Sequence, residues 1–113
     1  MASLSTHVLD TAQGCPAQGL ALTLYRVQGE QRVELGRYTT NADGRVDGGL
    51  FKQDDTELGE YEVVFEAGAY LRASGGSDRY LTQVPIRFSI YDQMHYHVPL
   101  LLSSFGYSTY RGS

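Results

Sequence analysis

The sequence predicts an all-β protein, an antiparallel β-sandwich of two sheets with one short α-helix. Apolar residues recur at every second position in several segments, which is the period of a strand with one face in a core. Turn signals separate these segments, and glycine is frequent, with 13 residues. A length of 113 residues lies near the commonest domain size, so we expect one domain over residues 1–113.

The first half of the chain carries three expected strands. In residues 4–10, His7 should point to the opposite side from Leu4 and Val8, because successive side chains of a strand alternate. Residues 20–27 alternate leucine with smaller or polar residues, as in a half-buried strand. Residues 32–40 repeat the pattern, with Val33 and Leu35 separated by a glutamate, before an Asn-Ala-Asp-Gly turn.

The second half predicts further strands and the helix. Residues 61–65 form a β-branched and aromatic run, and residues 84–92 alternate isoleucine and phenylalanine with arginine and serine. Residues 95–103 should place His95 and His97 on one face, and Pro99 favours an edge position or a bulge. Only residues 67–75 have helix character, and the end of the chain adds one possible short strand. That last strand would lie within residues 107–113.

Composition argues against several classes of protein. The net charge of −4 and the scattered lysine and arginine residues disfavour nucleic-acid binding. No window is apolar over the ~20 residues of a membrane span, and no signal peptide is visible. Cys15 is the only cysteine, so no intrachain disulfide can form and a reducing cytoplasm is the expected location.

The three histidines are the main candidates for chemistry. A histidine on an outer strand face is by default a solvated polar residue, yet imidazole is also the side chain best suited to proton transfer near neutral pH. His95 and His97 also have the spacing of a strand metal pair, with His7 as a conceivable third ligand. Metal chemistry therefore stays an alternative, although the motif is weak.

Other polar residues have simpler explanations. Residues 43–45 read first as a turn, and Arg45 gains interest only if its segment runs beside that of His7, where its guanidinium could hold a carbonyl-rich substrate. Cys15 is interpreted as structural, because no basic neighbour favours a thiolate. Ser103 and Ser104 lack the context of a serine nucleophile.

Three stretches resemble the signatures of the transthyretin-related 5-hydroxyisourate hydrolases. They are LSTHVLDTAQGCPA at residues 4–17, TTNADGR at 39–45 and HYHVPLLLSSFGYSTYRGS at 95–113. The ending YRGS distinguishes these hydrolases from the vertebrate hormone carriers of the same fold. The chain departs from the family's usual Phe-Pro and Ser-Pro pairs at residues 81–82 and 103–104.

The resemblance implies a transthyretin-like (prealbumin-like) fold and a homotetramer whose central channel holds the active sites. It also implies hydrolysis of 5-hydroxyisourate to 2-oxo-4-hydroxy-4-carboxy-5-ureidoimidazoline in urate degradation, without a cofactor or metal. The implied catalytic residues are His7, Arg45, His97 and Ser113, and Tyr110 and Arg111 are expected to join them in binding the substrate.

The residue types suit this reaction, but leave roles open. His7 and His97 would share the proton transfers, Arg45 would hold carbonyl oxygens, and Ser113 would orient water or substrate. The sequence does not decide which histidine is the base, nor whether Ser113 acts through its hydroxyl or its carboxylate. The main alternative function is a non-enzymatic transthyretin-like binding module for a small ligand, although such a site would be more apolar.

Overall fold

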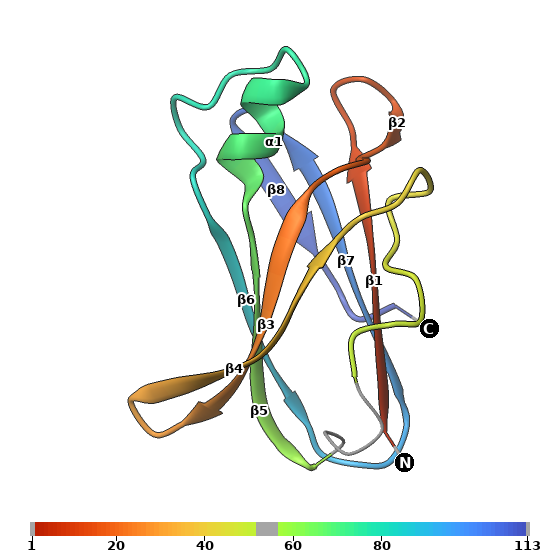
Figure 1. Ribbon diagram of the computed structural model, residues 1–113, viewed down its shortest axis with the longest axis vertical. Helices are drawn as coiled ribbons and strands as arrows, with labels where there is room; N and C mark the ends of the chain where they lie inside the picture. The colour runs from red at the N-terminus through yellow and green to blue at the C-terminus, as the bar shows by residue number, and fades with distance from the viewer. Residues whose placement is uncertain (1, 52–56, 113) are drawn as a thin grey trace.

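The computed structural model describes residues 2–51 and 57–112, which form two four-stranded sheets packed face to face. The first sheet has the order β2-β1-β7-β8. Its strands are β1 (Ser3–Asp10), β2 (Cys15–Pro16), β7 (His95–Ser103) and β8 (Gly106–Thr109). Figure 1 shows this sheet on one side of the molecule, with β1 and β7 side by side along most of its length. The two-sheet sandwich matches the sequence prediction, and so do these strands except β2, which was not predicted.

The second sheet has the order β4-β3-β5-β6 and is antiparallel throughout. Its strands are β3 (Ala21–Gln28), β4 (Gln31–Thr39), β5 (Gly59–Phe65) and β6 (Val84–Ile90). The β3–β4 hairpin extends beyond the rest of the sandwich (Figure 1). For this reason Val33 is 47% exposed. Of the two residues in the predicted alternation, Val33 and Leu35, only Leu35 packs against the core. A bulge at Leu35 shifts the register of the hairpin.

One strand pair differs from the prediction of an antiparallel sandwich. β1 and β7 are parallel, with Ser3 opposite His95 and Asp10 opposite Leu102. Parallel neighbours need a long connection, and here the whole second sheet and the helix lie between the two strands in sequence. Local alternation reports which face of a strand is buried, but it does not report the direction of a partner so distant in the chain.

The prediction of an edge position for the strand containing Pro99 was wrong. β7 lies inside the sheet, between β1 and β8. Pro99 is accommodated because β8 pairs only with residues from Leu100 onward, and the chain returns to β7 in a single bridge between Gly112 and His97. Between these two pairings the Pro99 carbonyl accepts a hydrogen bond of 2.7 Å from the Thr109 hydroxyl. The missing N–H thus falls where the ladder is interrupted.

The core lies between the sheets and is built from the inward residues of the predicted alternations. Its largest fully buried side chains include Tyr61, Phe65, two leucines of β3 (Leu22 and Leu24) and two of β7 (Leu100 and Leu102). Truncating such a residue to alanine typically costs about 2–5 kcal/mol. Every even-numbered side chain from Leu4 to Asp10 is buried in β1, which leaves the odd-numbered ones, including His7, on the outer face.

Two buried polar groups fix β1 in place. The Thr6 hydroxyl donates to the Val98 carbonyl at 2.6 Å, and Asp10, only 2% exposed, accepts from the Tyr70 hydroxyl at 2.8 Å. Burial, followed by the contact with Asp10, raises the pKa of Tyr70 to about 12, so the phenol remains a donor. These bonds hold the strand that carries His7 against both β7 and the helix.

The helix α1 (Ala67–Ala73) lies within the predicted segment, directly after β5. It closes one end of the sandwich (Figure 1), and its Tyr70 and Leu71 side chains are buried against the core. Within residues 2–51 and 57–112, no helix has the length and apolar character needed to cross a membrane.

Candidate functional site

The candidate site lies on the outer face of β1 and β7. His7 and His97 are both half-buried and project from this face, since the residues that flank each of them in its strand are buried. Ser5 is paired with His97 and His7 with Pro99, so the two histidines are offset by two residues on adjacent strands. The predicted outward direction of both side chains is confirmed.

Arg45 joins this face through a specific turn. The Asn41 side-chain oxygen accepts hydrogen bonds from the backbone N–H groups of Asp43 and Arg45, at 2.9 and 3.1 Å. Gly44 lies between these two residues and has a φ of 74°, a conformation that favours glycine. Its carbonyl accepts from Val8 N–H at 2.8 Å, and Arg45 then forms an antiparallel bridge with His7. The sequence made Arg45 a candidate only if its segment ran beside that of His7, and the bridge shows that it does.

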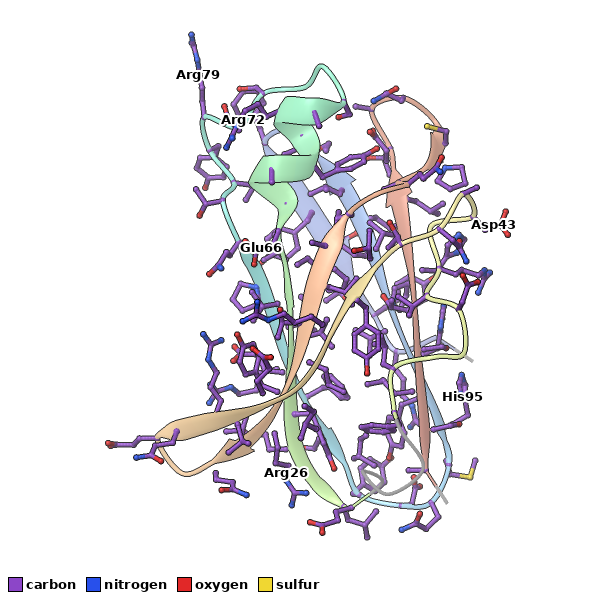
Figure 2. The ribbon with its side chains drawn as sticks, in the orientation of Figure 1. Arg26, Asp43, Glu66, Arg72, Arg79 and His95 are labelled. Atoms are coloured by element: carbon purple, nitrogen blue, oxygen red, sulfur yellow. The ribbon has the colours of Figure 1, made fainter. Side chains whose placement is uncertain are left out.

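Close packing also requires glycine at position 44. An added Cβ there would stand 2.4 Å from the Val8 carbonyl oxygen and 3.2 Å from Pro16 Cβ. The Asp-Gly-Arg sequence thus brings the backbone of the turn onto β1, and Arg45 emerges beside His7. Asp43 points away from the body of the protein (Figure 2), and it forms no ion pair with Arg45.

The side chains of His7 and Arg45 are available for a ligand. Arg45 is exposed, and among the described residues no carboxylate forms an ion pair with it. His7 likewise has no side-chain hydrogen bond within the described part of the chain. A guanidinium and an imidazole on one face suit a polar substrate with several carbonyl oxygens.

The environment of His97 perturbs its protonation equilibrium. Its Nδ1 lies 2.8 Å from the Ser5 hydroxyl. Burial lowers the pKa of His97 below its ordinary value, and the positive charges of Arg45, His7 and His95 lower it further. The imidazole is therefore predominantly neutral at neutral pH, as a general base must be.

The end of the described chain lies against His97. Gly112 N–H donates to the His97 carbonyl at 2.9 Å, and an added Cβ on Gly112 would stand 2.4 Å from His97 Cδ2. The glycine thus packs flat against the imidazole ring, with no room for a side chain. Ser113 follows Gly112 directly but lies outside the described residues, so its role stays a prediction.

Arg111 lies on the other side of β7 from the two candidate histidines. Its guanidinium covers the ring of Tyr96 at 4.3 Å and reaches the Tyr91 hydroxyl at 3.4 Å, and Tyr96 is buried on the inward face of the strand. Together with Tyr110 it lines a hollow of about 380 Å³ beside β6. Within this chain Arg111 is therefore separated from His97.

His95 is engaged in hydrogen bonds at both ring nitrogens. Nδ1 lies 2.6 Å from the Ser3 hydroxyl and Nε2 lies 2.9 Å from the Ser5 hydroxyl. Figure 2 shows His95 on the outer side of β1 and β7, away from the core. No group of three or more histidine, cysteine or acidic side chains in the described residues is arranged to hold a metal ion. A metal pair of His95 and His97 would require His95 to leave one of its serine partners, because both of its ring nitrogens are engaged.

The remaining candidates have local roles or none. The Ser103 hydroxyl donates to the Gly106 carbonyl at 3.1 Å, and Ser104 accepts from the backbone N–H of Ser77 at 3.1 Å, so both serines stabilise turns. Cys15 is exposed in the short strand β2 and does not pack in the core, contrary to a structural interpretation.

Sequence reasoning missed two residues of this site, Ser5 and Gly112. Parity along β1 does place Ser5 on the face of His7, but its contact with both His95 and His97 depends on the register of a strand about 90 residues away. Gly112 carries no signal beyond its place in the YRGS ending.

Comparison with known proteins agrees with the fold. The chain is 54% identical over 113 residues to the 5-hydroxyisourate hydrolase of Mesorhizobium japonicum, covering 97% of this chain and 91% of that protein. The Klebsiella pneumoniae 5-hydroxyisourate hydrolase structure is 38% identical, with a TM-score of 0.85 and complete coverage of both chains.

The same fold also occurs in a hormone-binding relative. Sea bream transthyretin, solved in complex with thyroxine, has a TM-score of 0.89 at 26% identity, and the match covers 97% of this chain and 94% of that one. The profile of the HIUase/Transthyretin family matches residues 4–112. From the near-complete match and the high identity, it follows that this chain belongs to the HIUase/Transthyretin family.

Proposed function

We propose that this chain hydrolyses 5-hydroxyisourate to 2-oxo-4-hydroxy-4-carboxy-5-ureidoimidazoline, a step of urate degradation. The observation that carries the proposal is the meeting of His7, Arg45 and His97 on one face of β1 and β7, in a chain 54% identical to a hydrolase of that name. Water forms a bond to a ring carbonyl carbon, the adjoining C–N bond breaks, and a proton passes to the departing nitrogen. The products of that cleavage are a carboxylate and a ureido group.

His97 is the general base in this proposal. Its lowered pKa keeps the imidazole neutral, and Ser5 occupies Nδ1, so Nε2 is the nitrogen left to take a proton from water. A positioned base of this kind contributes about 10²–10⁴-fold to a rate. The structure thus favours His97 over His7 for the role that the sequence left open.

Arg45 and His7 act on the substrate oxygens and the leaving nitrogen. The guanidinium donates hydrogen bonds to the carbonyl groups and stabilises the oxyanion that develops when water attacks. His7, bridged to Arg45 through the backbone, supplies the proton for the departing nitrogen. Both side chains have the freedom this needs, since neither is engaged by another described side chain.

Ser113 orients water or substrate from the end of the chain. The position of Gly112 against His97 supports this, because the next residue must begin within reach of the same imidazole. A peptide extension after Ser113 is therefore expected to lower kcat/KM strongly, whereas the same extension before Met1 is expected to have a smaller effect. Equal activities of the two fusions would contradict a role for the chain end.

We place the site in the channel of a homotetramer. His7, Arg45 and His97 lie on an outer sheet face, which one subunit alone leaves open to water, and exclusion of water strengthens the hydrogen bonds of a transition state. Arg111 would bind substrate only across a subunit boundary, since it faces away from His97 in its own subunit. Tyr110 keeps its predicted role as a substrate contact. Sedimentation equilibrium tests the assembly, with a mass of four chains expected.

Two further expectations accompany this proposal. We propose that residues 1–113 act as one domain, since one cluster of buried residues connects the two sheets and the helix. We also propose a cytoplasmic location, which the single exposed cysteine permits because no intrachain disulfide is needed.

The competing function is a small-molecule carrier. Sea bream transthyretin, with its bound thyroxine, is the relative that motivates it. A face that carries two histidines and an arginine suits a small polar substrate better than an apolar hormone. The test generates 5-hydroxyisourate from urate with urate oxidase and compares its removal by the chelator-treated protein with spontaneous decay. Thyroxine is titrated into the same preparation by calorimetry, and thyroxine binding without faster decay would favour the carrier.

A further inference from the structure

Four side chains on the outer face of β1 and β7 form a continuous hydrogen-bonded chain. Ser3 and Ser5 project from β1, directly opposite His95 and His97 of β7. Ser3 Oγ lies 2.6 Å from His95 Nδ1, Ser5 Oγ lies 2.9 Å from His95 Nε2, and Ser5 Oγ lies 2.8 Å from His97 Nδ1. The series of hydrogen bonds therefore runs Ser3–His95–Ser5–His97. It ends at His97, the imidazole that acts as the general base in the proposed function.

The central hydroxyl couples the two imidazoles. A serine hydroxyl has one hydrogen, and a neutral imidazole has one N–H and one lone pair. If Ser5 donates to one histidine it must accept from the other, so the tautomers of His95 and His97 are not independent. When both rings are neutral and the Ser5 hydroxyl donates to one of them, only two arrangements of the protons satisfy all three contacts.

The two arrangements differ in what His97 presents to a substrate. In the first, His97 Nδ1–H donates to Ser5, Ser5 donates to His95 Nε2, and His95 Nδ1–H donates to Ser3, which leaves a lone pair on His97 Nε2. In the second, every bond is reversed, and His97 Nε2 carries a hydrogen. Only the first arrangement makes His97 a base.

The charges around His97 favour the first arrangement. Arg45 follows the turn opposite β1, His7 projects from β1, and His95 lies on β7 itself; each repels added positive charge on His97. Nearby positive charge stabilises a lone pair on His97 Nε2, whereas an N–H there finds no acceptor among the described residues. The backbone of Gly112 lies against the ring and carries no titratable side chain.

We propose that Ser5, supported by His95 and Ser3, is a positioning residue that holds His97 in the Nδ1–H tautomer and so leaves Nε2 ready to accept a proton from water. The inference rests on the proposed function for its role in catalysis, but the tautomer itself is a property of the free protein.

The experiment combines NMR with kinetics. Two-bond ¹H–¹⁵N correlation spectra of the histidine rings, recorded on substrate-free protein, report the tautomer of each ring. We expect the Nδ1–H tautomer for His97 in the wild type and its loss in Ser5→Ala, with kcat reduced about ten- to a hundredfold and KM little changed. Ser5→Thr keeps the hydroxyl and should restore both the tautomer and the rate.

A matched control and the contrary results complete the test. Ser103→Ala removes a serine hydroxyl from the far end of β7, where it bonds only to a turn carbonyl, and should change neither the tautomer nor kcat. An Nε2–H tautomer for His97 in the wild type, or an unchanged tautomer in Ser5→Ala, would overturn the inference. If the wild type fails to accelerate the decay of 5-hydroxyisourate, the proposed function fails instead, and the spectra still judge the tautomer.

Discussion

Gly112 offers a way to displace the imidazole of His97 without altering any catalytic side chain. An alanine Cβ at this position would stand 2.4 Å from His97 Cδ2 and 3.1 Å from both Cβ and Cγ of the same side chain. Carbon atoms in contact are ordinarily about 3.5–4.0 Å apart, so the ring and the backbone of Gly112 must separate by about 1.1 Å or more. Gly112→Ala therefore moves either the base or the chain end that follows it.

The expected loss of activity exceeds the loss of stability. A displacement of about 1 Å in a catalytic constellation can reduce a rate about 100-fold, equivalent to about 2.7 kcal/mol in the activation barrier. The folded state would lose at most the bond from Gly112 N–H to the His97 carbonyl, worth about 0.5–1.5 kcal/mol. The midpoint of thermal unfolding should thus change little while kcat/KM falls by about two orders of magnitude.

The assay follows removal of freshly generated 5-hydroxyisourate and uses Gly106→Ala as its control. Gly106 lies in β8, and an added Cβ there would meet only Ser103 Oγ at 4.0 Å. The ring resonances of His97 should shift in Gly112→Ala and not in Gly106→Ala. If the Gly112 variant retains activity within about twofold of the Gly106 variant, the close packing at His97 has no bearing on catalysis and the reasoning fails.

Three further predictions follow from the same geometry. Replacing His7 or His97 by asparagine should abolish most activity with the fold intact, whereas His95→Asn should retain more, since His95 acts only through Ser5; equal losses at His95 and His97 would contradict this. Arg45→Gln removes a positive charge, so the pKa of His97 should rise toward its ordinary value of about 6.5 in an NMR titration; an unchanged or lower pKa would contradict the assignment. Gly44→Ala should destabilise the fold by about 1–3 kcal/mol in urea unfolding and lower kcat/KM through Arg45.

The Gly44 prediction has a close control in Gly48. Gly48 has φ of 78°, near the 74° of Gly44, but an added Cβ there meets nothing within 4 Å. Gly48→Ala should therefore report the backbone strain alone. A Gly44 variant no less stable than the Gly48 variant would show that the contact with the Val8 carbonyl is unimportant.

The lowered pKa of His97 also sets the sign of one pH effect on stability. The unfolded chain binds a proton at the ordinary histidine pKa of about 6.5, but the folded protein resists protonation of His97. This contribution to stability is fully present above pH 6.5 and is lost as the pH falls from there through the lower folded pKa. The acidic limb of kcat/KM should fall in the same range, below pH 6.5, because the base must be neutral.

The features of the fold that sequence could predict are those set by near neighbours. Period-two alternation identified the strands and the outward direction of His7, because burial alternates with each residue along a strand. Period-two alternation could not predict how distant segments pair. Contacts between residues about 90 positions apart determine that β1 and β7 are parallel and that the strand with Pro99 lies inside the sheet. The exposed Val33 depends on how far a hairpin extends past its neighbours.

The same division applies to the site. The approach of Arg45 to His7 could be stated only as a condition, since a turn signal does not say which strand the next residue will join. Ser5 was missed because its partners are set by the register of β7. Arg111 was expected to bind substrate because of its place in the YRGS ending, but in the fold its side chain lies over Tyr96.

The most direct test of the account compares wild type and His97→Asn side by side after both have been treated with a chelator. Each is added to 5-hydroxyisourate produced from urate by urate oxidase, and the decay is measured against the spontaneous rate. The account predicts rapid decay with the wild type and nearly spontaneous decay with the variant, both proteins being folded by circular dichroism. Spontaneous decay with folded wild type, or equal acceleration by the two proteins, would contradict a hydrolase whose base is His97.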